Sequence, residues 1–140
     1  MRTLATLVRL HRFRLDERRR EQGELERLVA GLKDEIERLA SEVVTEQSVA
    51  ATSLEASFGY GAYAQGVIER RERLEQSLAQ AEAKLVEAVD KVNAAFREAK
   101  RHELLLAERR RQRAAEEARL EQIDLDEVSI DGFRRRAGQR

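Results

Sequence analysis

The sequence predicts an all-α fold, a long antiparallel two-helix coiled-coil hairpin, and three observations support this prediction. Charged residues make up 39% of the 140 residues and aromatic residues only 4%, and the chain has no proline and no tryptophan. Such a composition is typical of long helices and coiled coils. Apolar residues recur at every third or fourth position in both halves of the chain, and a glycine-rich segment separates the halves.

The first helix is predicted over about residues 3–56. Counting alternately by three and four from Leu4 gives a stripe in which nine of twelve positions are apolar. The stripe consists of Leu4, Val8, His11, Leu15, Arg18, Gln22, Leu25, Val29, Leu32, Ile36, Leu39 and Val43. From Leu25 to Val43, leucine alternates with a β-branched residue, as at the d and a positions of a heptad. At Arg18 and Gln22 the helix either packs poorly or leaves its partner.

The turn is predicted at about residues 57–66, near Gly59 to Gly61. Three glycines, at positions 59, 61 and 66, make a continuing helix costly. Two amphipathic helices of similar length joined by a glycine turn form an antiparallel hairpin. A turn centred on Tyr60 places Leu4 near Glu116. A parallel homodimer of each long helix is the alternative.

The second helix is predicted over about residues 67–128, followed by a flexible basic tail at 132–140. The whole chain, residues 1–140, is then a single coiled-coil hairpin. The stripe of this helix consists of Leu74, Leu78, Ala81, Leu85, Ala88, Val92, Ala95 and Ala99. Val89, Phe96 and Leu106 follow a neighbouring register, which indicates either a register shift or extra apolar surface for a third partner.

Charge is unevenly distributed, although the net charge is zero. Residues 1–22 carry seven arginines against three acidic residues, and residues 97–114 carry seven basic against three acidic residues, so each segment has a net charge of +4. Residues 115–131 carry seven acidic residues against Arg119, a net charge of −6. In the hairpin the two basic segments lie side by side and repel each other. Either an acidic partner relieves this repulsion, or the arginines are solvated and pair with glutamates on their own helix.

Several classes of function are excluded or disfavoured. Without cysteine the chain cannot form a disulfide or a zinc–thiolate site. It has no phosphate-binding P-loop motif, and a rod offers no pocket that would activate its many carboxylates, so we expect no enzyme activity and no cofactor. His11 and His102 are too isolated in the sequence to indicate a metal site. No stretch approaches the roughly 20 apolar residues of a membrane span. Zero net charge and few aromatic residues disfavour nucleic-acid binding.

Four segments together resemble the FliJ family of the bacterial flagellar type III export apparatus. They are Leu4-x-x-Leu7-Val8-x-Leu10 followed by Leu15-Asp16-Glu17-Arg18-Arg19; Tyr60 and Tyr63; Phe96-Arg97-Glu98-Ala99-Lys100-Arg101-His102-Glu103-Leu104; and Glu117-x-Arg119-Leu120-Glu121-Gln122-x-x-Leu125-Asp126-Glu127. The last of these is the most specific. The chain departs from better-known members in lacking a tryptophan and a glutamine-rich middle.

This resemblance implies a fold similar to the stalk subunit of rotary ATPases. It also implies a non-enzymatic export component that binds the hexameric flagellar export ATPase, contacts the cytoplasmic domain of the export gate protein and takes part in handling export chaperones. Such a protein is cytoplasmic and peripheral at the inner face of the cell membrane. A generic coiled-coil adaptor or scaffold protein is the alternative.

Candidate binding residues follow from their positions in the predicted hairpin. For the ATPase end we predict Arg9, Arg12, Arg18, Arg19, Arg109, Arg110, Arg111 and Arg113. For the gate we predict the hairpin tip, with Phe58, Tyr60 and Tyr63, although these aromatic residues are equally explained as a small cap over the hairpin end. A C-terminal overhang with Leu120, Ile123, Leu125, Asp126 and Glu127 is a further interaction candidate.

Overall fold

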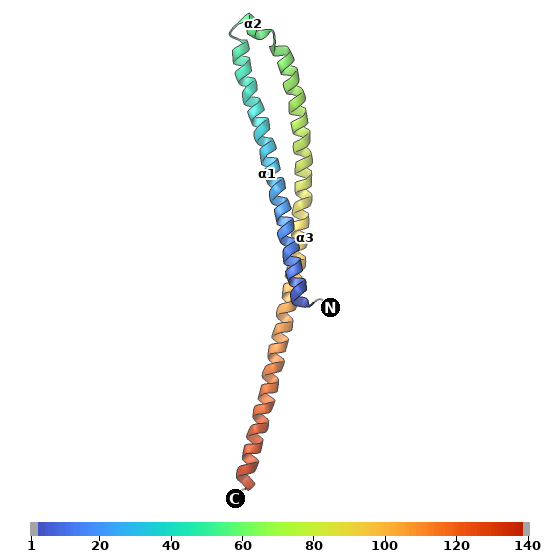
Figure 1. Cartoon of the computed structure of the whole chain (residues 1–140), viewed down its shortest axis with the longest axis vertical. Coiled ribbons are helices and arrows are strands. Elements are labelled where there is room, and N and C mark those ends of the chain that lie inside the picture. Colours follow the sequence, from blue (N-terminus) through green and yellow to red (C-terminus); the bar gives the residue numbers. More distant parts are fainter. Residues whose placement is uncertain (1–2, 139–140) are drawn as a thin grey trace. The chain divides into compact units, whose positions relative to one another are not determined.

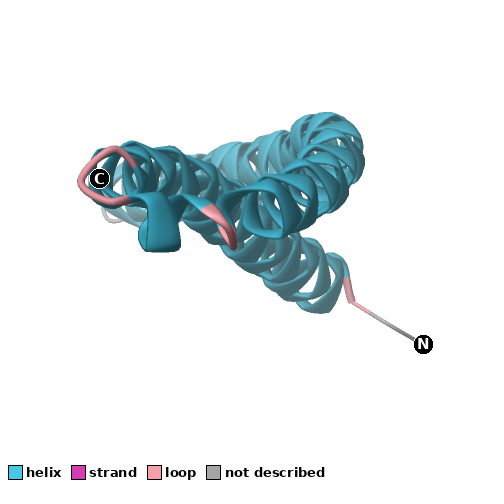
Figure 2. Ribbon diagram, turned by 90° about the horizontal axis from the view of Figure 1, so that it is seen from above, coloured by secondary structure: helices cyan, strands magenta, loops and turns pink. Residues whose placement is uncertain are grey.

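The computed structural model describes residues 3–138, and every regular element in this range is a helix. Helix α1 spans Leu4–Ala50, the short helix α2 spans Leu54–Ser57, and helix α3 spans Tyr60–Gly138. Figure 2 shows that loops are confined to short connections, and no strand occurs among residues 3–138. Helices α1 and α3 run antiparallel and pack against each other (Figure 1). The predicted all-α helical hairpin is therefore confirmed.

The chain divides into two compact units, which are described separately. The turn unit comprises Phe13–Phe96, and the terminal unit comprises Met1–Arg12 together with Arg97–Arg140. Each unit contains part of α1 and part of α3. No helix within residues 3–138 is both long enough and apolar enough to cross a membrane.

The core of the turn unit is a thin seam between α1 and α3. Its buried residues are Leu15, Val29 and Leu39 from α1 and Ala81 and Ala88 from α3. The other members of the two predicted stripes that fall in this unit are half-buried, including Arg18 and Gln22, so the predicted stripes lie along the contact. Alanine on α3 opposite larger residues on α1 allows close packing of the helices. Val89 and Phe96, from the neighbouring register, are exposed.

The turn lies earlier than the glycines predict. Helix α1 ends at Ala50 rather than near residue 56, and Ala51 to Ser53 form the loop before α2. Ser53 is the N-cap of α2, with extended backbone, and its Oγ accepts a hydrogen bond of 3.1 Å from the backbone N–H of Ala56. A serine in this position satisfies a donor that the helix itself leaves unpaired.

The glycines predicted to form the turn are mostly helical. Gly61 and Gly66 lie inside α3 and Gly59 immediately precedes it, and no described glycine has a positive φ. Each helical glycine costs about 1 kcal/mol relative to alanine. Packing of the half-buried Tyr60, Tyr63 and Val67 against α1 offsets this cost.

The register between the helices is shifted accordingly. In the turn unit, Lys33 Nζ lies 3.9 Å from Glu82 Oε1. In the terminal unit, Leu4 shares a cavity with Leu106, Arg109 and Arg110, about two turns from its expected neighbour Glu116. The expectation was wrong because it centred the turn on Tyr60.

Helix α3 also continues beyond its predicted end at residue 128. It reaches Gly138, so residues 132–138 of the predicted tail are helical, and residues 139–140 lie outside the described residues. Arg135 and Arg136 occupy the last turn, where positive charge interacts favourably with the helix dipole. Every residue from 107 to 131 is exposed, so this part of α3 contributes no buried residue to the seam.

Candidate functional site

The most distinctive surface of the terminal unit is a group of three arginines beside the first turn of α1. Arg109, Arg110 and Arg113 line a cavity of about 510 Å³ together with Thr3, Leu4, Ala5 and Leu106. We call these three arginines the basic patch. The antiparallel arrangement places them there, because residues 109–113 of α3 pass the start of α1.

The basic patch lacks the carboxylate partners that neighbouring arginines have. Arg12 donates from Nε to Glu103 Oε1 over 2.8 Å, and Arg111 forms two hydrogen bonds with Glu108. No ion pair within 4.0 Å joins Arg109, Arg110 or Arg113 to any of residues 3–138. Three exposed cations without local neutralisation give this surface a positive potential.

The paired carboxylates respond to these contacts. The hydrogen bond from Arg111 and the nearby positive charge lower the pKa of Glu108, and the hydrogen bond from Arg12 lowers the pKa of Glu103. Both carboxylates are therefore held in the ionised form. Arg12 and Arg111 are accordingly less available to a partner than the basic patch is.

The remaining arginines of the predicted ATPase end fall in different places. Arg9 lies in the terminal unit and is exposed. Arg18 and Arg19 belong to the turn unit. Arg18 is half-buried in the seam and its Nη1 donates to Glu21 Oε2 over 3.2 Å, whereas Arg19 is exposed. The predicted set is thus divided between the two units.

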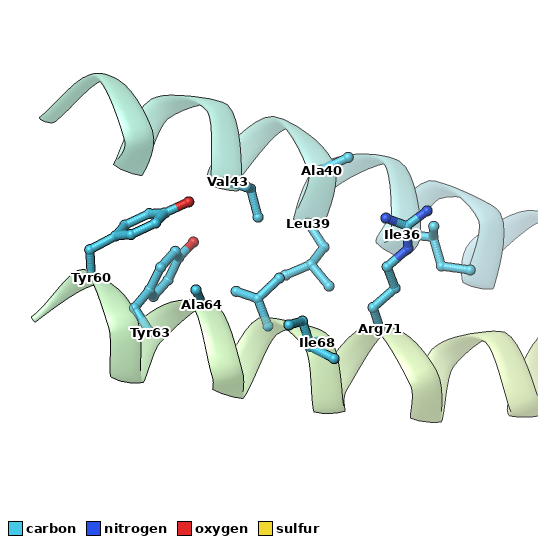
Figure 3. A pocket seen from close by; sticks show the side chains of 10 residues that line it. Ile36, Leu39, Ala40, Val43, Tyr60, Tyr63, Ala64, Ile68 and Arg71 are labelled. Carbon is cyan, nitrogen blue, oxygen red and sulfur yellow. The ribbon is translucent and has the colours of Figure 1, made fainter. Parts of the chain in front are cut away.

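A second surface lies in the turn unit, where the chain reverses. A cavity of about 350 Å³ opens between α1 and α3 and is lined mainly by apolar residues, including Ile36, Leu39, Val43 and Val67. Figure 3 shows the rings of Tyr60 and Tyr63 lying between the two helices, beside Val43. The two rings are 6.1 Å apart. Partial burial, followed by the negative charges of Glu46 and Glu42, raises the pKa of Tyr63.

The three predicted tip aromatics therefore differ in accessibility. Tyr60 and Tyr63 are half-buried against α1, as a cap would be. Phe58 is the C-cap residue that follows α2 and is 81% exposed, and Leu54, the first residue of α2, is 77% exposed. Two large apolar side chains exposed this fully at one turn are available to a partner protein.

The predicted C-terminal overhang is a helical segment of the terminal unit. Leu120, Ile123, Leu125 and Val128 are between 40% and 68% exposed, and Asp126 accepts a hydrogen bond from Gln122 over 3.0 Å. Glu127 is also exposed. The segment offers exposed apolar side chains among seven acidic residues.

The structure also brings together two histidines that are far apart in the sequence. His11 of α1 and His102 of α3 stack with ring centroids 4.0 Å apart and an angle of 24° between the ring planes. The expectation that they are isolated was therefore wrong. A turn centred on Tyr60 places His11 near Arg109, two turns away from His102, so only the corrected register reveals the pair.

Comparison with known proteins agrees with this architecture. The family model described as flagellar FliJ protein matches residues 1–138. No curated protein and no solved structure gives a significant match. A match over nearly the whole chain includes both long helices, the turn and the basic patch. The chain therefore belongs to the flagellar FliJ protein family, a structural component of the flagellar protein export apparatus.

Proposed function

We propose that this protein is a non-enzymatic stalk that binds the hexameric flagellar export ATPase and couples it to the membrane export gate. Family membership and the antiparallel packing of α1 and α3 support this role. A helical hairpin of this kind is stiff, because each helix restrains bending of the other along the seam. The stalk would act in the cytoplasm, peripherally at the inner face of the cell membrane.

The observation that carries the ATPase contact is the basic patch. Arg109, Arg110 and Arg113 are exposed, clustered and without a carboxylate partner among the described residues. The like charges of these three arginines repel one another in the unbound protein. An acidic surface on the ATPase would relieve this repulsion on binding. Arg9 is exposed in the same unit, forms no ion pair with any of residues 3–138, and would add to this contact.

The gate contact is assigned to the turn unit. Phe58 and Leu54 present exposed apolar surface at the turn, while Tyr60 and Tyr63 hold the start of α3 against α1. In this assignment Phe58 contacts the cytoplasmic domain of the gate protein directly, and the two tyrosines position the turn.

Export-chaperone handling is assigned to the exposed segment of α3 in the terminal unit. Leu120 and Ile123 lie three residues apart and so share one side of the helix. Together with Leu125 and Val128 they leave apolar surface uncovered by the described chain. Chaperone binding would bury this surface.

The ATPase assignment is tested with two variants that lose equal charge from the same helix. One variant carries Arg109→Gln, Arg110→Gln and Arg113→Gln. The control carries Arg70→Gln, Arg71→Gln and Arg73→Gln in the turn unit, where all three arginines are also exposed. Binding to purified export ATPase is measured by surface plasmon resonance, together with the effect on ATP hydrolysis.

We expect the patch variant to bind about tenfold or more weakly, equivalent to about 1.4 kcal/mol. The control variant is expected to bind like the wild-type protein. Equal losses in both variants would show only nonspecific charge attraction and would contradict the assignment. Absence of ATPase binding by the wild-type protein would overturn the proposed function itself.

A further inference from the structure

We infer that His11, Glu98 and His102 form a binding site for a divalent transition-metal ion, with Zn²⁺ the best match to the ligands. All three residues belong to the terminal unit, and they offer three ligand atoms that lie within 4.8 Å of one another. His11 comes from α1, and Glu98 and His102 come from α3. A metal ion held by this triad would join the start of α1 to α3.

The spacing on α3 brings two of the ligands onto one face. Glu98 and His102 are four residues apart, so their side chains are neighbours on the helix surface. The two side chains are in proximity, with His102 Nδ1, the ring nitrogen that does not bind the metal, 3.9 Å from Glu98 Oε2. Two ligands four residues apart on a helix provide a chelating pair, and helical zinc sites in enzymes use the same spacing.

The opposite helix supplies the third ligand. The imidazole of His11 stacks on that of His102 at 4.0 Å between centroids. Both histidines are half-buried. Because the lone pair of an imidazole lies in the ring plane, one of the two stacked rings must tilt for both histidines to bind the same ion. The site therefore depends on the antiparallel register and is absent from either helix alone.

The chemistry of His102 suits a metal ligand. Its Nδ1 lies 2.8 Å from the backbone carbonyl oxygen of Glu98 and donates a hydrogen bond to it. In the neutral ring this leaves the lone pair on Nε2. In metal-bound histidines, a hydrogen bond donated by the ring nitrogen that does not bind the metal fixes the tautomer and the ring orientation. It also makes the metal-binding nitrogen more basic.

Two imidazoles and one carboxylate favour Zn²⁺ over Mg²⁺ or Ca²⁺, which prefer sites made of oxygen ligands. Three protein ligands leave a fourth tetrahedral position open to water. At zinc–ligand distances of about 2.1 Å, tetrahedral ligands are about 3.4 Å apart, so the present side chains would close by about 1 Å or more on binding.

The surrounding charges set the strength of the site. Arg101 Nη1 lies 3.8 Å from Glu98 Oε1 and competes with the metal for that carboxylate. Arg12 and Lys100 are both within 4.0 Å of Glu103 and direct their charge toward it. Glu98 is exposed, so it can turn toward the histidines without disturbing the seam.

The site is tested with the purified full chain, freed of metal by a chelator and titrated with Zn²⁺ in a calorimeter. We expect one Zn²⁺ per chain, with displacement of both imidazole signals in NMR spectra. His102→Gln is expected to weaken binding by at least about tenfold, and Glu98→Gln to weaken it by a smaller factor. The control is Glu108→Gln, which removes a carboxylate of the same helix outside the triad and should leave the affinity unchanged.

Circular dichroism shows whether each variant keeps its helices, and the exposed Glu98→Gln keeps the test valid if a histidine variant unfolds. Failure of the wild-type chain to bind Zn²⁺ saturably at about 100 µM would overturn the inference. Equal binding by the wild-type, His102→Gln and Glu98→Gln proteins would also overturn it, because the ion would then sit on other surface carboxylates.

Discussion

Arg111 holds Glu108 through two hydrogen bonds, one of 2.6 Å from Nη2 to Oε1 and one of 3.0 Å from Nε to Oε2. This two-pronged contact neutralises Arg111 within its own helix. The neighbouring Arg109, Arg110 and Arg113 have no such partner among the described residues. Of the four arginines between residues 109 and 113, Arg111 is therefore paired within its own helix, whereas the three arginines of the basic patch are available for binding.

This pairing predicts a change in the titration of Glu108 when Arg111 is replaced. In Arg111→Gln the pKa of Glu108 should rise toward its ordinary value, because the hydrogen bond and positive charge that lower it are lost. A lowered folded-state pKa contributes stability above the unfolded-state pKa, and this contribution disappears as pH falls through the folded-state pKa. NMR of the carboxyl carbon measures the shift, and an unchanged pKa would show that Arg111 is not its cause.

The seam predicts a strong contrast between two leucines. Leu39 is 3% exposed between α1 and α3, whereas Leu54 is 77% exposed in α2. Leu39→Ala should lower the free energy of unfolding by about 2–3 kcal/mol, because it removes buried apolar surface and leaves a cavity. Leu54→Ala should change it by less than about 0.5 kcal/mol. Urea denaturation followed by circular dichroism measures both, and similar effects would contradict the packing.

The position of the turn predicts the effect of replacing Gly61. It lies inside α3, and a Cβ added there meets no other atom within 4 Å. Gly61→Ala should therefore raise the free energy of unfolding by about 0.5–1 kcal/mol, as should the control Gly31→Ala inside α1. If Gly61 instead formed the turn with a positive φ, its replacement would be destabilising while that of Gly31 would not.

The register predicts distances between spin labels, and the natural chain has no cysteine to interfere. The pair Lys33→Cys and Glu82→Cys should give a shorter distance than the pair Lys33→Cys and Glu87→Cys, since five residues of helix advance about 7.5 Å. Double electron–electron resonance measures both distances. The reverse order would support a turn at Tyr60, and a signal lost on dilution with unlabelled chain would indicate a homodimer.

Sequence reasoning succeeded where a side chain's burial depends on periodicity. The stripe from Leu25 to Val43 lies along the seam because heptad spacing alone places these residues on one face. The prediction of the turn position failed because α3 begins at Tyr60 and tolerates Gly61 and Gly66 despite their cost. Tyr60 and Tyr63 pack against α1 there and offset that cost. The chain leaves α1 earlier, and Ser53 caps the next helix by accepting a hydrogen bond from the backbone N–H of Ala56. The sequence did not single out Ser53 as a cap, because several other serines and threonines lie nearby.

Predicting the candidate site required the correct alignment of α1 along α3 more than it required the correct residue types. Arg109, Arg110 and Arg113 were chosen for their charge, but sequence did not distinguish them from Arg111, which pairs with Glu108. The His11–His102 contact was missed because an error of several residues in the turn moves each residue of α1 by nearly two helical turns along α3. Composition and spacing fix the faces of the two helices, whereas the loop sets their alignment.

The most direct test of the stalk proposal is site-specific photocrosslinking in a mixture of this protein, the export ATPase and the cytoplasmic domain of the gate protein. A photoreactive phenylalanine derivative replaces either Gln112, beside the basic patch, or Phe58, at the turn. The account predicts that position 112 crosslinks to the ATPase and position 58 to the gate domain. Crosslinks with the partners exchanged, or no crosslink from position 112 to the ATPase, would contradict it.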